Sequence, residues 1–214
     1  MLRQYLESHC AMRASFNDKF SARDPTEQYI CLEDFVLDRG HAYEQAALTP
    51  DELDWVHQLE GLWVNRYGLP KFKECFHTSQ WMAYSMVPFL PRTVAVSYVE
   101  GYAIHNGLIP MLHGWLAVNG KVVDFTWRTS PFEDGLTDAY TLGTWGEGSD
   151  YFGVKFSDDD VLTQVMKGET RSLIDNWEDG FPVLQLPRLK PPTWLEQARQ
   201  HKASFERVRK SKDV

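Results

Sequence analysis

The order of apolar and polar residues predicts a pair of neighbouring strands joined by a tight turn. Residues 111–118 form an apolar, strand-like run, and residues 121–127 are rich in β-branched and aromatic side chains. Between them, Asn119 and Gly120 are the strongest short signal for a β-hairpin. The pattern therefore predicts two antiparallel strands with a two-residue turn.

The length of this turn decides which side chains meet across the hairpin. A two-residue turn places Val118 opposite Lys121, and because alternate residues share a face, His113 and Asp124 then lie on the same side of the sheet. As diagonal neighbours, their backbones are roughly 7–8 Å apart and their side chains are within reach. A turn of odd length would separate them onto opposite faces. The sequence therefore predicts a contact between His113 and Asp124.

Other segments show equally regular patterns. Apolar residues recur at helical spacing after Thr49 and Pro50, which are typical of a helix start. Further predicted elements are a helix over residues 1–20, a strand over 93–104, a short strand over 151–156, a helix from Ser157 to Lys167 and a helix over 170–177. The glycine-rich stretch 128–150 predicts a long loop, which we interpret as a candidate for substrate gating.

A cysteine lies at the start of one further predicted helix. Gly68 and Pro70 end the preceding helix, and residues 71–86 have helical composition until Pro88, so Cys75 falls in the first turn or just after it. A thiol acts as a nucleophile in its thiolate form, which a helix N-terminus and a nearby imidazolium both favour. The unpaired N–H groups of a first turn also favour an oxyanion.

Cys75, His113 and Asp124 together supply the parts of a thiolate acyl-transfer site. An imidazole that accepts a proton from a nucleophile needs a fixed tautomer, and a carboxylate on its far nitrogen provides this. Asp124 lies within the apolar run 122–125, where an unpaired carboxylate would cost several kcal/mol to bury, so it needs a partner such as His113. The sequence predicts these three residues as catalytic, acting through a thioester.

The three residues and their surroundings resemble the transglutaminase-like branch of the papain-like cysteine superfamily. The matching segments are residues 73–76, 113–116 and 123–127, and the resemblance covers about residues 70–130. It departs from the pattern at Gly114 and at Phe125, where proline is usual. Cys75 also lacks the neighbouring small residues and tryptophan that are common in the superfamily.

The resemblance implies an α+β fold with a papain/transglutaminase-like core, in which an antiparallel sheet packs against the Cys-bearing helix, with additional N- and C-terminal helices. The implied activity is that of an amide or peptide hydrolase, or of an amine acyltransferase. The expected substrate is an amide- or amine-bearing small molecule or protein side chain.

Residues on the strand before His113 are candidates for substrate binding. Tyr98, Glu100 and Tyr102 share one face by the two-residue period, and Trp115 lies on the following strand. If that face lines the cleft, Glu100 selects a cationic or amine-bearing substrate, and a tyrosine hydroxyl assists an oxyanion. An ordinary polar sheet face with aromatic packing explains the same residues.

Other interpretations of these residues remain open. His77 would point about 200° away from Cys75 on a helix, and His105 falls in a turn, so both are poor candidates for the base. A zinc site would use Cys75, His77, His113 and Asp124, which are all legitimate ligand types, although no standard spacing is present. A catalytically silent binding or regulatory protein of the same fold and a metal-dependent hydrolase are therefore alternatives. The leading hypothesis needs neither a metal nor another cofactor.

Composition and charge narrow the class of protein. The chain has 214 residues with 43% hydrophobic and 14% aromatic content, which predicts one globular catalytic-type domain over residues 1–187 with its core at about 50–156. A basic C-terminal helical tail follows at residues 188–214, where eight basic and three acidic residues give +5. The formal charge of −8 then leaves −13 on the rest and argues against nucleic-acid binding, except through that tail.

Targeting signals and cysteine usage suggest a compartment. No apolar run reaches the length of a membrane span, and the first residues lack the apolar segment of a signal peptide, so we expect a cytoplasmic protein without a membrane partner. Three cysteines without framework spacing fit reduced thiols. Of these, Cys10 and Cys31 are expected to be packed apolar residues.

Overall fold

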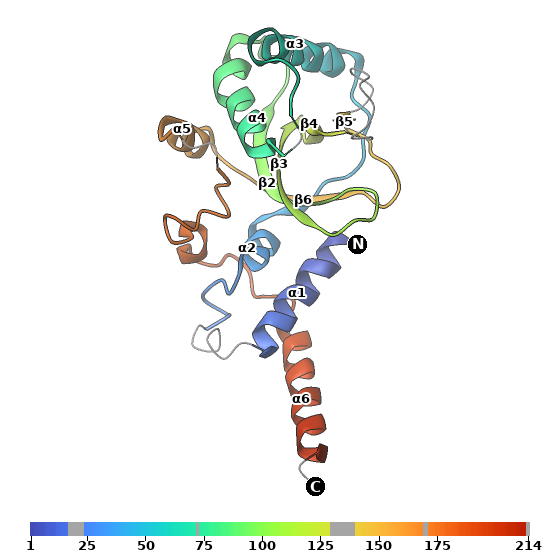
Figure 1. Ribbon diagram of the computed structural model, residues 1–214, viewed down its shortest axis with the longest axis vertical. Coiled ribbons are helices and arrows are strands. Elements are labelled where there is room, and N and C mark those ends of the chain that lie inside the picture. Colours follow the sequence, from blue (N-terminus) through green and yellow to red (C-terminus); the bar gives the residue numbers. More distant parts are fainter. Residues whose placement is uncertain (17–23, 72, 129–139, 169–170, 213–214) are drawn as a thin grey trace. The chain divides into compact units, whose positions relative to one another are not determined.

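The chain folds into two units, one built from both ends and the other from the middle. The computed structural model describes residues 1–16, 24–71, 73–128, 140–168 and 171–212 (Figure 1). The terminal unit contains residues 1–41 and 174–214, and the central unit contains residues 42–173. This division differs from the expected boundary at residue 187, because the segment after it belongs with the first helices.

The terminal unit is helical. Its elements are α1 (Leu2–Phe16), α2 (Leu32–Arg39), the 3₁₀ turn η3 (Pro182–Gln185) and α6 (Leu195–Lys212). Helix α1 packs against both α2 and α6. Their shared core includes Cys10, Cys31 and Trp194, and the buried carboxylate of Asp34 forms an ion pair with Arg188. The basic C-terminal segment is therefore anchored at its start to the first helices.

The central unit is built around a six-stranded sheet. Its strands are β1 (His41–Ala42), β2 (Val96–Ile104), β3 (Met111–Val118), β4 (Lys121–Arg128), β5 (Tyr140–Leu142) and β6 (Asp150–Lys155), in the order β1-β6-β2-β3-β4-β5. The pairings β2–β3, β2–β6, β3–β4 and β4–β5 are antiparallel. With its helices, the chain is an α+β protein, as the sequence predicted.

Helices cover one face of this sheet. They are α3 (Pro50–Tyr67), α4 (Cys75–Trp81), the π-helical turn η1 (Met82–Met86), the 3₁₀ turn η2 (Val87–Phe89) and α5 (Asp158–Met166) (Figure 1). Trp63 of α3, Met82 of η1 and Val161 of α5 pack with Tyr98 and Leu116 of the sheet. Reciprocal capping boxes begin α3 at Thr49 and α5 at Ser157, which confirms the two helix starts predicted from these residues.

The opposite face of the sheet is also buried. Trp115, Ala117, Val122, Trp127 and Tyr151 form a second cluster there. A sheet covered on both faces explains why the hairpin strands read as nearly continuous apolar runs.

Two predicted segments differ from the structure. No helix forms over Arg171–Trp177, and that prediction is wrong; the backbone there turns, and Leu173 donates its N–H to Glu100. The predicted loop 128–150 contains the short strand β5, while its residues 129–139 lie outside the described residues. Within the described part of the chain, every helix is too short or too polar to cross a bilayer.

Candidate active site

The hairpin that carries the predicted base and carboxylate has the predicted turn. Val118 lies opposite Lys121, as a two-residue loop requires. Asn119 and Gly120 have φ values of 49° and 81°, the left-handed region that tight hairpin turns need. The Asn119 side chain holds the turn, because its Oδ1 accepts from the Ala95 N–H at 2.8 Å. The predicted register is confirmed for the three pairs nearest the turn, from Val118 and Lys121 to Leu116 and Val123.

His113 and Asp124 meet where the two strands separate. The ladder between β3 and β4 ends at the pair Leu116 and Val123, and Asp124 then pairs with Thr141 of β5. His113 Nε2 lies 2.6 Å from Asp124 Oδ2, and the two residues are only 7% and 0% exposed. The contact predicted from the turn length is therefore present, in a nearly water-free setting.

The Asp124 carboxylate is held by donors on every side. Its Oδ1 accepts from the Thr126 N–H at 2.9 Å, the Thr126 hydroxyl at 3.0 Å and the Trp127 N–H at 3.1 Å. Its Oδ2 accepts from the Tyr151 hydroxyl at 3.1 Å as well as facing His113. Burial alone would raise the pKa of Asp124, but the charge of His113 and these hydrogen bonds lower it below its ordinary value.

The imidazole of His113 is correspondingly stabilised in its charged form. Burial opposes the charge, yet the Asp124 carboxylate and the Cys75 side chain together raise the pKa of His113 to about 10. The site thus favours an imidazolium and carboxylate pair at neutral pH. The carboxylate also fixes the orientation of the ring.

Cys75 lies at the first residue of α4, and its thiol interacts with His113. A side-chain hydrogen bond with Cys75 and the charge of Cys75 both raise the pKa of His113. Because Nε2 of His113 faces Asp124, Nδ1 is the ring nitrogen left for the thiol. Lys73, two residues earlier, has a φ of 72°, a costly conformation for a lysine that bends the chain into the helix. The structure therefore brings all three predicted catalytic residues together.

Helix α4 approaches β3 closely at Gly114. A Cβ atom added to Gly114 would lie 3.0 Å from Phe76 Cδ1 and 3.0 Å from the Tyr98 hydroxyl. The Ser79 hydroxyl donates to the Gly114 carbonyl at 3.2 Å. The glycine beside His113, at which the sequence departs from the superfamily pattern, is thus the contact that lets the Cys-bearing helix lie against the strand.

Aromatic rings surround the His113 imidazole. The Trp127 ring lies 4.4 Å from it between centroids, and the rings of Trp115 and Tyr151 follow at 6.1 and 6.5 Å. The sequence did not single out Trp127, Thr126 or Tyr151 as site residues. The spacing Asp124-x-Thr126 was the available signal for Thr126, whereas Tyr151 comes from a distant strand with no local signal.

The predicted substrate-binding residues lie mainly in the interior. The Glu100 carboxylate accepts from the Tyr98 hydroxyl at 2.7 Å, the Ser172 hydroxyl at 2.7 Å and the Leu173 N–H at 2.7 Å. Tyr98, Glu100 and Trp115 are buried, and Tyr102 is half-buried. Burial, with the nearby charges of Glu100 and Cys75, raises the pKa of Tyr98 well above its ordinary value. Gln80 of α4 also contacts this group of side chains, because its amide donates to the Tyr98 hydroxyl at 3.1 Å.

The other histidines occupy different surroundings. The ring of His77 packs near Trp63 and Trp81, and the ring of His105 stacks on Trp127 at 5.1 Å. Over the described ranges, no three His, Cys, Asp or Glu side chains converge in a way that could hold a metal ion. Of the residues considered for zinc, His77 thus lies among tryptophan rings, away from the His113 and Asp124 pair.

A distinct hollow lies on the helical side of the central unit. It has a volume of about 360 Å³ and is lined by Tyr84, Arg92, Tyr98 and Asp158, among others, but not by the three predicted catalytic residues.

Comparison of the chain with known protein families, with curated protein sequences and with solved structures finds no match. The geometry of the site must therefore support any functional conclusion by itself.

Proposed function

We propose that this chain is a cysteine-nucleophile acyl-transfer enzyme with a papain/transglutaminase-like core, and that Cys75, His113 and Asp124 are its catalytic triad. The observation that carries the proposal is the 2.6 Å contact between His113 Nε2 and Asp124 Oδ2, with the Cys75 thiol interacting with the same imidazole. A buried carboxylate, an oriented imidazole and a thiol at the start of a helix are the parts that thiolate catalysis requires.

The reaction begins from a pair in which the Cys75 proton already resides on His113, so that the sulfur is a thiolate and the ring is an imidazolium. The thiolate sulfur then attacks an acyl carbonyl carbon, such as that of a carboxamide, and the carbonyl oxygen becomes an oxyanion. Backbone N–H groups at the start of α4 lie on the same turn as the sulfur and are the candidate donors to that oxyanion.

Collapse of the oxyanion breaks the bond between carbon and the leaving amine, which takes the proton from His113. A thioester on Cys75 remains. Water or a second amine then attacks it, giving hydrolysis or acyl transfer, and the thiol is regenerated. The raised pKa of His113 favours the imidazolium, which is the acid that the leaving amine needs.

Asp124 supports this cycle by holding the imidazole. Its second oxygen is occupied by the Thr126 and Trp127 donors, so the carboxylate cannot rotate away from His113 without losing three hydrogen bonds. We assign Glu100 a positioning role rather than direct contact with substrate, because protein donors from Tyr98, Ser172 and Leu173 already surround it.

The proposal is tested with two small probes, since the natural substrate is unidentified. p-Nitrophenyl acetate reports acyl transfer, because attack by a thiolate releases p-nitrophenolate and leaves an acetyl thioester. We expect a burst from the wild-type chain that is lost in Cys75→Ala, together with an acetyl group mapped to Cys75. Cys10→Ala is the matched control and should retain the burst, since Cys10 lies in the terminal unit.

Iodoacetamide labelling separates an enzyme from a catalytically silent protein of the same fold. The labelled position is mapped by mass spectrometry over a range of pH. Rapid labelling of Cys75 well below pH 8, lost in His113→Ala, supports the proposal. Labelling of Cys75 at the rate of an ordinary thiol, with no burst from p-nitrophenyl acetate, would refute catalysis and favour the silent protein.

A further inference from the structure

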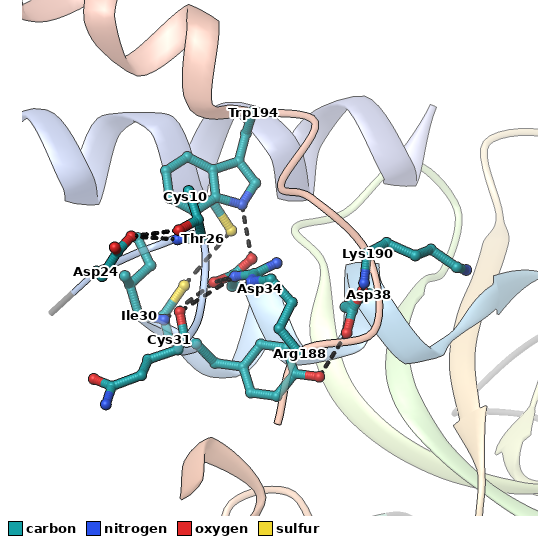
Figure 2. A network of polar contacts seen from close by, with 12 residues as sticks. Cys10, Asp24, Thr26, Ile30, Cys31, Asp34, Asp38, Arg188, Lys190 and Trp194 are labelled. Atoms are coloured by element: carbon teal, nitrogen blue, oxygen red, sulfur yellow. Dashed lines mark hydrogen bonds and ion pairs between the residues drawn. The ribbon is translucent and has the colours of Figure 1, made fainter. Parts of the chain in front are cut away.

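Two thiols lie side by side in the core of the terminal unit. Cys10 Sγ is 3.5 Å from Cys31 Sγ, and the two residues are 0% and 3% exposed. Cys10 belongs to α1, whereas Cys31 is the residue directly before α2. Figure 2 shows the two sulfur atoms facing each other across this junction, beside the ring of Trp194. This pair is remote in sequence from the proposed catalytic residues.

The sulfur atoms are close enough to bond after a small shift. A disulfide requires a separation of about 2.05 Å, so the two atoms need to approach each other by about 1.5 Å. Rotation of a cysteine side chain moves its sulfur over that range. Around the pair, Ile30, Trp194 and Ala198 form an apolar setting in which an uncharged disulfide is as acceptable as two thiols.

We propose that Cys10 and Cys31 are a modification site at which a peroxide forms a reversible disulfide, covalently joining α1 to the start of α2. Hydrogen peroxide oxidises one thiol to a sulfenic acid and leaves as one water. The second sulfur attacks the first, the S–S bond forms, the S–O bond breaks, and a second water carries away the remaining oxygen and the protons. The two thiols are oxidised, and the peroxide is reduced.

The surroundings of the pair also set its reactivity. Burial, the neighbouring Cys31 and the negative charges of Asp34 and Glu33 raise the pKa of Cys10. The same carboxylate of Asp34 accepts from the Trp194 indole at 2.8 Å and pairs with Arg188, so it stays in place beside the thiols (Figure 2). The Cys10 sulfur therefore remains a thiol at neutral pH, and oxidation is slow until peroxide is present in excess.

Closure of this bond has a mechanical consequence. It links two helices across the 20 residues that separate Cys10 from Cys31 in the sequence. Such a cross-link lowers the conformational entropy of the unfolded chain. The oxidised protein should therefore unfold at a temperature about 5–10 °C higher than the reduced one.

The experiment exposes the full-length, reduced chain to hydrogen peroxide and then maps its peptides without reduction. We expect a peptide that joins Cys10 to Cys31 and is lighter by two hydrogen atoms than the two separate thiol peptides together. Dithiothreitol should recover both thiols. Cys75→Ser should give the same link, because the proposal does not depend on acyl transfer. Cys31→Ser should give none.

The exposed Met166, which is 72% accessible, serves as the internal measure of oxidant dose. Cys10 and Cys31 that both remain thiols after Met166 has become a sulfoxide would overturn the proposal. So would separate oxidation of each cysteine to a sulfinic acid, or a link from either one to Cys75. Mapping of the wild-type chain decides the question even if a cysteine variant fails to fold.

Discussion

His113 and Asp124 lie eleven residues apart in the sequence, and a two-residue turn brings His113 Nε2 to within 2.6 Å of Asp124 Oδ2. The other carboxylate oxygen of Asp124, Oδ1, accepts from backbone N–H groups of β4, so the pair is arranged before any substrate binds. Preorganised electrostatics of this kind cost no rearrangement during a reaction.

Asp124→Asn should separate the electrostatic role of the carboxylate from its structural role. The amide retains the size of the side chain but removes the negative charge that raises the pKa of His113. Burial then lowers that pKa, and the imidazolium should be lost at neutral pH. We expect the acylation of Cys75 by p-nitrophenyl acetate to slow by ~10²–10⁴-fold. Asp159→Asn, at an exposed position in α5, is the control and should leave the rate unchanged.

The same ion pair predicts how stability depends on pH. The pKa of His113 is raised from 6.5 to about 10, so its contribution is complete below pH 6.5 and is lost as the pH rises through about 10. The pKa of Asp124 is lowered from 3.8, so its contribution is complete above that pH and is lost as the pH falls through the lowered value. The stabilisation should be greatest between about pH 4 and 6.5.

Urea unfolding of the wild-type chain and Asp124→Asn at a series of pH values tests this expectation. The difference in free energy of unfolding should reach a few kcal/mol near pH 5 and shrink toward pH 10. A difference that stays constant across this range would contradict the ion pair as its cause.

Local sequence signals were sufficient to predict the hairpin and the contact between His113 and Asp124. Asn119 and Gly120 dictate the turn, and the alternation of a strand then determines that His113 and Asp124 share a face. Local composition also predicted a helix after Pro70 with Cys75 near its start, although α4 begins at Cys75 rather than at residue 71. These features depend on residues that are neighbours in the chain.

The remaining features arise from tertiary contacts that have no local pattern. Tyr151 reaches Asp124 from a strand 27 residues further along the chain. Strand period alone also does not reveal that residues 172 and 173 donate to Glu100. The terminal unit was missed for the same reason, since Arg188 pairs with Asp34 across 154 residues.

Gly114→Ala should disturb the contact between the Cys-bearing helix and β3. The new methyl group would lie 3.0 Å from Phe76 Cδ1 and from the Tyr98 hydroxyl, so the Phe76 ring next to Cys75 has to shift slightly. We expect a loss of about 1–3 kcal/mol in unfolding free energy and slower labelling of Cys75 by iodoacetamide.

Gly61→Ala is the matched control for that substitution. Gly61 lies inside α3 with no atom within 4 Å of an added Cβ, so alanine should raise stability by roughly 0.5–1 kcal/mol through helix propensity. Equal labelling rates in Gly114→Ala and the wild-type chain would show that the close approach does not position the thiol.

Glu100→Gln tests whether the buried carboxylate positions the site or selects substrate. Its oxygens accept from Tyr98, Ser172 and Leu173, and an amide nitrogen in place of one oxygen would face a donor. We expect a loss of about 1–3 kcal/mol in unfolding free energy, and Ser172→Ala, which removes a single donor, should cost less. If Glu100 is a positioning residue, cationic and neutral ester probes should lose rate by the same factor. A selective loss for the cationic ester, with stability unchanged, would instead place Glu100 against the substrate.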